Sequence, residues 1–220
     1  MNQEQINFWK PYIDLIGEEN FTLIKGHEGV MDFVQSKHYC GMDTSSFGVH
    51  RESNRNVAIN RYKSYQELLS KGSLSADDIE KIFLSYVDKA YFDTELVFLV
   101  TKHCSNLTLD EYWNLVIDIW CRQEFTTGGD RGENWKVIFN HRQRPEYLTK
   151  DLPEEFTAYR AGEETGFSWT LDKKIADKFF NRFNNQFGDI PMLKRNFTKN
   201  DAVFYTNRRN EKEVVIISNA

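Results

Sequence analysis

Residues 155–183 read EFTAYRAGEETGFSWTLDKKIADKFFNRF, and this stretch decides the expected fold of the C-terminal part of the chain. Side chains alternate over Phe156–Arg160, which predicts a β-strand that delivers an arginine among apolar neighbours. A glycine-bearing turn follows, and Ser168-Trp169-Thr170 then forms a second short strand. Apolar residues next recur at spacings of three and four as far as Phe183, so an amphipathic helix is predicted, with Thr170 or Asp172 as its cap. An arginine placed among apolar neighbours needs an anion, and the arrangement is therefore typical of a binding site.

Two more strands are expected near the C-terminus. Their content of Val, Ile, Phe and Tyr places them over Ala202–Thr206 and Glu213–Ser218. Between them, residues 207–210 form a tight polar turn just before Glu211 and Glu213. In an extended segment, two glutamates two residues apart face the same side, which suits general acid–base chemistry.

Taken in order, these segments resemble a known family of enzymes. The Tyr159-Arg160 pair with Gly162 nearby, the Ser168-Trp169-Thr170 segment and the Glu211-Lys212-Glu213 segment resemble the motifs of mono-ADP-ribosyltransferases of the arginine–serine–glutamate class. The likeness is greatest to small phage-encoded and bacterial members, and it covers roughly the last third of the chain. It implies an α+β protein whose C-terminal domain is an ADP-ribosyltransferase-like β-sandwich of two small sheets, with a cleft for NAD between them.

The resemblance also implies a catalytic role for four residues. Arg160 would hold the phosphate and ribose side of NAD, and Ser168 would orient Glu213. Glu213 would grip a ribose hydroxyl and stabilise the positive charge that develops on the sugar, while Glu211 would receive the proton of the acceptor. The chemistry supports these assignments, because cleavage of the bond between nicotinamide and ribose needs a carboxylate near the ribose and cations near the diphosphate.

The predicted contacts to NAD come from the same motifs: Arg160, Ala161, Gly162, Ser168, Trp169, Thr170 and Phe187. One of these residues, Ala161, departs from the family pattern. In that pattern a glycine directly follows the arginine, and the backbone of the glycine approaches nicotinamide. Here Ala161 takes that place and Gly162 comes next, so the approach requires a negative φ at Ala161. Phe187 falls in a predicted loop over residues 184–189, where it would stack on the nicotinamide ring or anchor the loop to the core.

The leading functional prediction is transfer of ADP-ribose from NAD to an arginine of a protein, with release of nicotinamide. The acceptor follows from the resemblance, since Glu-x-Glu accompanies arginine acceptors in related enzymes. Arg208 and Arg209 indicate a target with an acidic surface, or equally a solvated turn. The same cleft would serve an NAD glycohydrolase or a nucleic-acid ADP-ribosyltransferase. In a noncatalytic module that binds a host or defence protein, Arg160 and Glu213 would form only a structural ion pair.

The composition is that of a folded protein. Of its 220 residues, 40% are hydrophobic and 15% aromatic, and the formal net charge of -5 gives no reason to expect nucleic acid or an anionic membrane as a partner. The N-terminus lacks the features of a signal peptide and no stretch is long enough to span a bilayer, so a cytoplasmic location is predicted, that of the host if the protein is phage-encoded. Three scattered cysteines fit a reducing compartment.

Residues 1–150 are predicted to be mainly helical, with a role that the sequence does not indicate. Amphipathic spacing predicts a helix over residues 4–17, whereas no element is assigned over residues 21–60. A short buried helix is expected around Trp135. Pro145 and Pro153 flank a polar segment that places the domain boundary near residue 150, ahead of the catalytic core at 151–220. Capping boxes are predicted at three helix starts: Ser64 with Glu67, Ser75 with Asp78, and Thr108 with Glu111.

Two further features are interpreted as structural. Residues 125–132 lack the complete pattern of a phosphate-binding loop and are expected to form a surface loop. The neighbours His38 and Cys40, and likewise His103 and Cys104, have no second motif at a spacing that would complete a metal site. No metal is therefore expected.

Overall fold

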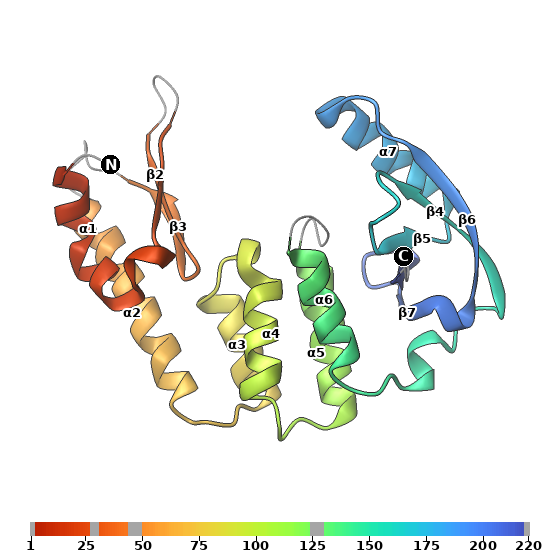
Figure 1. The fold of residues 1–220 in the computed structure, drawn as a ribbon, viewed down its shortest axis with the longest axis horizontal. Helices are drawn as coiled ribbons and strands as arrows, with labels where there is room; N and C mark the ends of the chain where they lie inside the picture. Colours follow the sequence, from red (N-terminus) through yellow and green to blue (C-terminus); the bar gives the residue numbers. More distant parts are fainter. Residues whose placement is uncertain (1–2, 27–30, 44–49, 124–129, 218–220) are drawn as a thin grey trace. The chain divides into compact units, whose positions relative to one another are not determined.

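The computed structural model describes residues 3–26, 31–43, 50–123 and 130–217 (Figure 1). In these residues seven α-helices accompany two antiparallel sheets, which confirms the predicted α+β class. The chain divides into two compact units, Met1–Leu107 and Thr108–Ala220. Most of the loop predicted at residues 125–132 lies outside the described residues.

The division between the units lies earlier than the predicted boundary near residue 150. Two helices, α5 (Leu109–Arg122) and α6 (Arg131–Asn140), belong to the C-terminal unit because their aromatic side chains pack on its sheet. The rings of Trp120 and Phe139 lie 6.1 Å and 5.9 Å from the ring of Phe204. An apolar stripe predicts that a helix is buried, but it does not indicate which sheet buries it.

The N-terminal unit contains four helices and a small sheet in strand order β1-β2-β3 within the described residues. Its first helix ends before Gly17 and the Ser75–Asp78 capping box opens another, both as predicted. The predicted box of Ser64 and Glu67 is wrong, because both residues lie inside one long helix, which apolar spacing alone did not reveal. The elements are α1 (Gln3–Ile16), β1 (Thr22–Ile24), β2 (Phe33–Ser36), β3 (Tyr39–Met42), α2 (Arg51–Leu69), α3 (Ala76–Ser85) and α4 (Phe92–Lys102).

His38 is a buried titratable group of this unit. It is buried, its Nδ1 atom lies 2.9 Å from the Tyr86 carbonyl oxygen, and its ring centroid lies 4.4 Å from that of Tyr65. Burial lowers the pKa of His38 to about 4, the Tyr86 carbonyl opposes this shift, and the charges of Lys37 and Arg61 add to it. The folded protein therefore holds His38 as a neutral side chain in weak acid.

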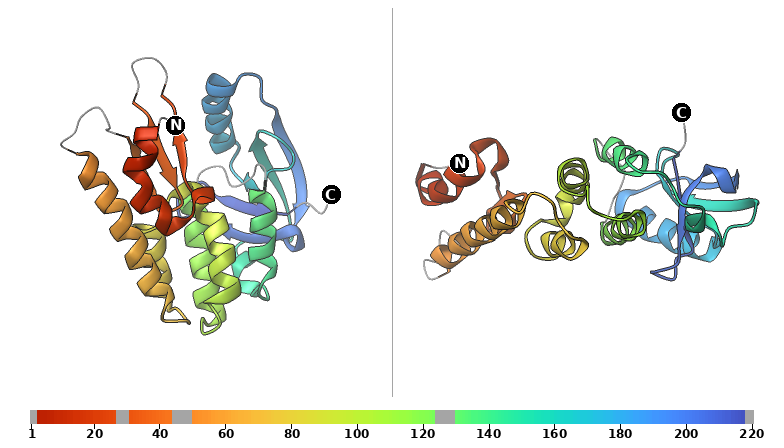
Figure 2. Two further views of the ribbon diagram at one scale, coloured as in Figure 1. Left: turned by 60° about the vertical axis from the view of Figure 1, so that its left-hand side comes forward. Right: turned by 90° about the horizontal axis from the view of Figure 1, so that it is seen from below.

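The C-terminal unit is built on a five-stranded antiparallel sheet in the order β6-β4-β5-β8-β7. Thr108 and Glu111 form the predicted capping box at the start of α5, and α6 contains the helix predicted around Trp135. Figure 2 gives two further views of these elements, in which α7 packs against β4 and β5. The strands and the third helix are β4 (Glu155–Ala161), β5 (Ser168–Thr170), α7 (Lys173–Phe187), β6 (Met192–Thr198), β7 (Ala202–Thr206) and β8 (Glu213–Ile216).

A single sheet is present in the described residues of this unit, where two small facing sheets were expected. The sheet is nevertheless almost divided, since β4 and β5 share only the residue pair Tyr159 and Thr170. On one side of this pair, β4 is matched to β6 along its whole length; on the other, β5 pairs with β8 and β8 with β7. The strands β4 and β5 thus diverge just where the motif residues Arg160 and Ser168 lie.

The helix α7 is longer than predicted. Asp172 caps its start by accepting a hydrogen bond from the Lys174 amide at 2.9 Å, as one of the two predicted caps. The helix continues to Phe187 and ends at Gly188, whose φ of 84° suits glycine, so the loop predicted over residues 184–189 is wrong. Residues 184–186 are polar because they form an exposed turn of the helix, and a run of polar residues resembles a loop in the sequence.

The described helices differ from membrane-spanning helices in length or in apolar character. Within the described residues, none combines the length and the apolar character that crossing a membrane requires.

We expect the free energy of unfolding to fall as the pH is lowered towards about 4, because the unfolded chain protonates His38 near its ordinary pKa of 6.5 whereas the folded chain does not. The lowered pKa corresponds to about 3 kcal/mol at the acid end of this range. Urea denaturation at neutral pH and near pH 4 measures the loss. His38→Gln, which cannot titrate, should lose less stability on acidification than the wild type; equal losses would contradict the assignment.

Candidate functional site

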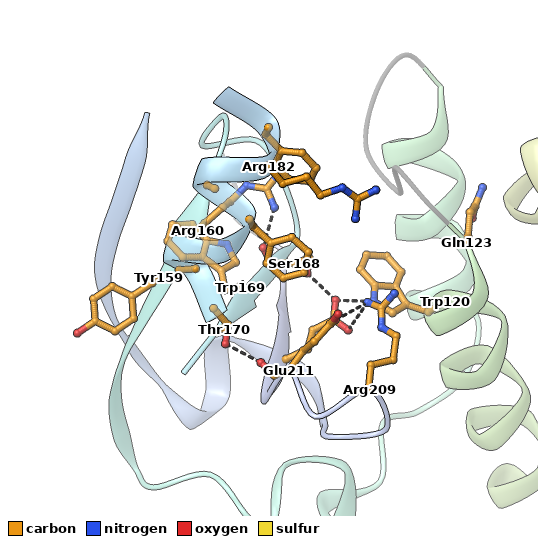
Figure 3. A pocket seen from close by; sticks show the side chains of 15 residues that line it. Trp120, Gln123, Tyr159, Arg160, Ser168, Trp169, Thr170, Arg182, Arg209 and Glu211 are labelled. Atoms are coloured by element: carbon orange, nitrogen blue, oxygen red, sulfur yellow. Dashed lines mark hydrogen bonds and ion pairs between the residues drawn. The ribbon is translucent and has the colours of Figure 1, made fainter. Parts of the chain in front are cut away.

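A pocket of about 290 Å³ opens where β4 and β5 diverge (Figure 3). Its walls come from α5, β4, β5, α7 and the segment that leads into β8, all within the C-terminal unit. The volume is at the lower end of the range for small-molecule sites, about 300–1,000 Å³. The pocket therefore has the size of a small-molecule site.

Glu213 is the buried carboxylate of this pocket, with a residue exposure of only 4%. The hydroxyl of Ser168 donates to its Oε1 atom at 2.5 Å, and the indole nitrogen of Trp120 donates to the same atom at 3.0 Å. The other carboxylate oxygen accepts from Arg209 at 3.3 Å. In Figure 3 the side chains of Ser168, Trp120 and Arg209 converge on one point, so three different elements fix the orientation of this carboxylate.

The sheet register explains why Ser168 reaches Glu213. Thr170 is opposite Glu213 and Ser168 is opposite Val215 in the pairing of β5 with β8. Since side chains alternate along a strand, Ser168, Thr170 and Glu213 project from the same face. The predicted orientation of Glu213 by Ser168 agrees with this hydrogen bond.

Arg160 is a residue of β4, and its side chain extends across the gap to β5. Its Nε atom donates to the Glu163 carbonyl at 2.8 Å and its Nη1 atom donates to the Ser168 carbonyl at 2.6 Å. Burial lowers the pKa of the Arg160 guanidinium, against the opposing effect of the charges on Glu163 and Glu213. Within the described residues, Arg160 forms no ion pair and its Nη2 atom has no hydrogen-bond partner, so this cation is open to an anionic ligand.

Glu211 and Glu213 meet in a way that the sequence did not predict. The segment between them is not extended, because Lys212 has a φ of 46° and β8 begins only at Glu213. The Glu211 carbonyl accepts from Thr170 at 2.6 Å, which holds the bend in place. The two carboxylates instead come together on the guanidinium of Arg209, which lies 2.9 Å from Glu211 and 3.3 Å from Glu213.

Burial raises the pKa of the Glu211 carboxyl, and the nearby charge of Glu213 raises it further. The cations Arg209 and Arg182 act in the opposite direction. A carboxylate with a raised pKa binds a proton more readily, which suits a group that receives one during a reaction.

The pocket gathers most of the predicted residues. Arg160, Ala161, Ser168, Trp169, Thr170, Glu211 and Glu213 all line it. Ala161 is not among the residues with a positive φ. The expected approach to nicotinamide requires a negative φ at this residue, so the backbone at Ala161 is compatible with it. Gly162 does not line the pocket; its amide donates to the Pro191 carbonyl at 2.9 Å and its φ is 112°. Phe187 is also absent from the lining, because it ends α7 with 59% of its surface exposed.

Several lining residues were missed from the sequence. Trp120 was not singled out in the sequence, although a buried indole N–H needs an acceptor and could have indicated a polar partner. Phe179, Arg182 and Phe183 supply the wall formed by α7. Arg209 was expected in a substrate-contacting or solvated turn, and no sequence signal indicates that it folds back onto the glutamates.

The polar groups of the pocket do not form a metal centre. Among the described residues, no three His, Cys, Asp or Glu side chains cluster in a way that could hold a metal ion.

Comparisons of the chain with protein-family models, with curated proteins and with solved structures give no match. The functional interpretation therefore depends on the geometry of the pocket and on the motifs.

We expect Gly166→Ala to displace Arg160, because a Cβ atom at position 166 would overlap the guanidinium. The carbonyls of Glu163 and Ser168 would lose their donor, at a cost of about 1–3 kcal/mol in the free energy of unfolding. Gly132→Ala is the matched control, since its added Cβ makes only an ordinary contact of 3.7 Å with Phe167 on a helix that favours alanine. Denaturation curves of both variants measure the difference, and equal stability of the two would contradict the close packing at Gly166.

Proposed function

We propose that the C-terminal unit is an NAD-dependent mono-ADP-ribosyltransferase that transfers ADP-ribose to a guanidinium group of a protein and releases nicotinamide. The observation that carries the proposal is that Arg160 and Glu213 line one pocket without pairing with each other. The cation beside Glu213 is Arg209. The main structural explanation of the motifs, an ion pair between Arg160 and Glu213, is therefore not the arrangement that the chain adopts.

The diphosphate of NAD is the anion that Arg160 would bind. A partly buried cation without a paired anion is costly, and a free N–H of a guanidinium forms a strong hydrogen bond with a phosphate oxygen. Arg182 of α7 supplies a second positive charge at the pocket, and it has no ion-pair partner in the described part of the chain. Two cations that line one pocket match the two charges of a diphosphate.

Glu213 would stabilise the ribose as the bond to nicotinamide breaks. Positive charge then develops on the sugar, and a fixed carboxylate in a site with little water stabilises that charge most effectively. Ser168 and Trp120 are neutral donors, so they orient the Glu213 carboxylate without cancelling its negative charge. The Glu213 carboxylate is shared with a cation, Arg209 at 3.3 Å, and its charge is otherwise available to a cationic sugar.

Glu211 would receive the proton that the acceptor loses. A guanidinium nitrogen that attacks the ribose must give up one proton, and a carboxylate with a raised pKa next to it is suited to take that proton. The contact between Arg209 and both glutamates supports this choice of acceptor, because it demonstrates that a guanidinium fits against the pair.

We expect Glu213→Gln to lower the rate of nicotinamide release from NAD by about 100-fold or more, since it removes the charge that stabilises the cationic sugar. The assay measures nicotinamide with and without a host-cell lysate as a source of acceptor. Glu155→Gln, an exposed glutamate on β4 of the same sheet, should leave the rate unchanged. A wild-type protein that releases no nicotinamide in either condition would support a noncatalytic module instead.

We expect Glu211→Ala to lower the transfer of ADP-ribose to a guanidinium acceptor by about 100-fold, the usual contribution of a general base, and to lower nicotinamide release much less. Both quantities are measured in one reaction with agmatine as the acceptor. A ratio of transfer to release that is the same in wild type and variant would indicate a glycohydrolase or an acceptor other than guanidinium.

A further inference from the structure

The guanidinium of Arg209 occupies the place where the two glutamates meet. Its Nη2 atom lies 2.9 Å from Oε2 of Glu211 and 3.3 Å from Oε2 of Glu213. Its Nη1 atom donates to the Cys121 carbonyl at 3.2 Å. The side chain lines the pocket and is 42% exposed, so it is fixed by its contacts and still accessible to a ligand.

The backbone holds this arginine in position. The Asn210 amide donates to the Asn207 carbonyl at 3.0 Å, which closes the turn that carries Arg209. The side chain of Asn207 accepts from the Lys212 amide at 3.0 Å, and Asn210 and Lys212 both adopt positive φ. Lys212 is further tied to Asp172 at 3.1 Å. A turn fixed on both sides presents Arg209 to the pocket.

The neighbouring arginine provides an internal comparison. Arg208 belongs to the same turn, and its side chain has the same exposure of 42%. Its Nη1 atom pairs with Asp118 at 3.2 Å and it contacts neither glutamate. Two adjacent arginines of equal exposure therefore differ in one respect, namely which of them lies against the two carboxylates.

We propose that Arg209 is itself an acceptor, and that the chain transfers ADP-ribose from bound NAD to its own Arg209. This inference rests on the proposed function of the same pocket. The guanidinium is already placed against the residue that would stabilise the ribose and against the residue that would take the proton. Holding two reacting groups together in this way makes the step unimolecular and strongly favours it over attack by a group in solution.

The step balances without any further reactant. The bond between the ribose C1 atom and the nicotinamide nitrogen breaks, and its electron pair leaves with nicotinamide. A lone pair on Nη2 of Arg209 forms the new bond to C1 as the Nη2 proton passes to Glu211 and then to solvent. The products are nicotinamide, a proton and a chain that carries ADP-ribose on Arg209.

The test incubates the whole chain with NAD and no added acceptor, follows nicotinamide release, and locates the modification by mass spectrometry of peptides. We expect ADP-ribose on Arg209 at a rate per chain that does not depend on protein concentration. Arg209→Lys should lose this label because an amine replaces the guanidinium. The substitution keeps the positive charge beside the glutamates. Arg208→Lys, the matched control, should be labelled as the wild type is.

Four results would overturn the inference. Nicotinamide release, or transfer to agmatine, with no label on Arg209 would reject it and leave the proposed function intact. Equal labelling of Arg208 and Arg209 would indicate that exposure decides the site. A labelling rate per chain that rises with protein concentration would show that one chain modifies another. The absence of nicotinamide release and of transfer to agmatine would reject the proposed function together with the inference.

Discussion

The candidate site depends on the bond by which Arg160 joins the two parts of the C-terminal sheet. Beyond the single pair Tyr159 and Thr170, the ladder between β4 and β5 stops, and the guanidinium of Arg160 donates to the Ser168 carbonyl instead. A side chain thus satisfies a backbone acceptor that a neighbouring strand would otherwise satisfy. The two strands are held together and yet kept apart, and the space between them is the pocket.

The opposite side of the pocket is organised around one carboxylate. Glu213 receives hydrogen bonds from a strand, a helix and a turn, through Ser168, Trp120 and Arg209. Because each donor is itself anchored in a different element, the carboxylate is oriented before any ligand arrives. Preorganised charge of this kind is the form of stabilisation that contributes most to many enzymes. The site is therefore a property of the whole C-terminal unit rather than of the three short motifs.

The sequence predicted local features better than the way they assemble. Helix starts such as Thr108 with Glu111, and the strand that delivers Arg160, follow from patterns that act within a few residues. The contact of Trp120 with Glu213 joins residues 93 positions apart, and no local pattern encodes it. The position of Arg209 depends on a bend at Lys212, a left-handed conformation in a residue that rarely adopts it. The boundary between the two units was predicted too late in the chain for a similar reason. An apolar stripe indicates that a helix is buried, but it does not indicate which sheet the helix packs against.

The order of the site residues along the chain has a consequence for synthesis. Glu213 opens β8, the last strand of the described residues, whereas Trp120 on α5 and Arg160 on β4 are made much earlier. A growing or truncated chain that stops before β8 contains the arginine but neither glutamate of the pocket. Any chemistry of this pocket would therefore be withheld until the strand that carries Glu213 has been made.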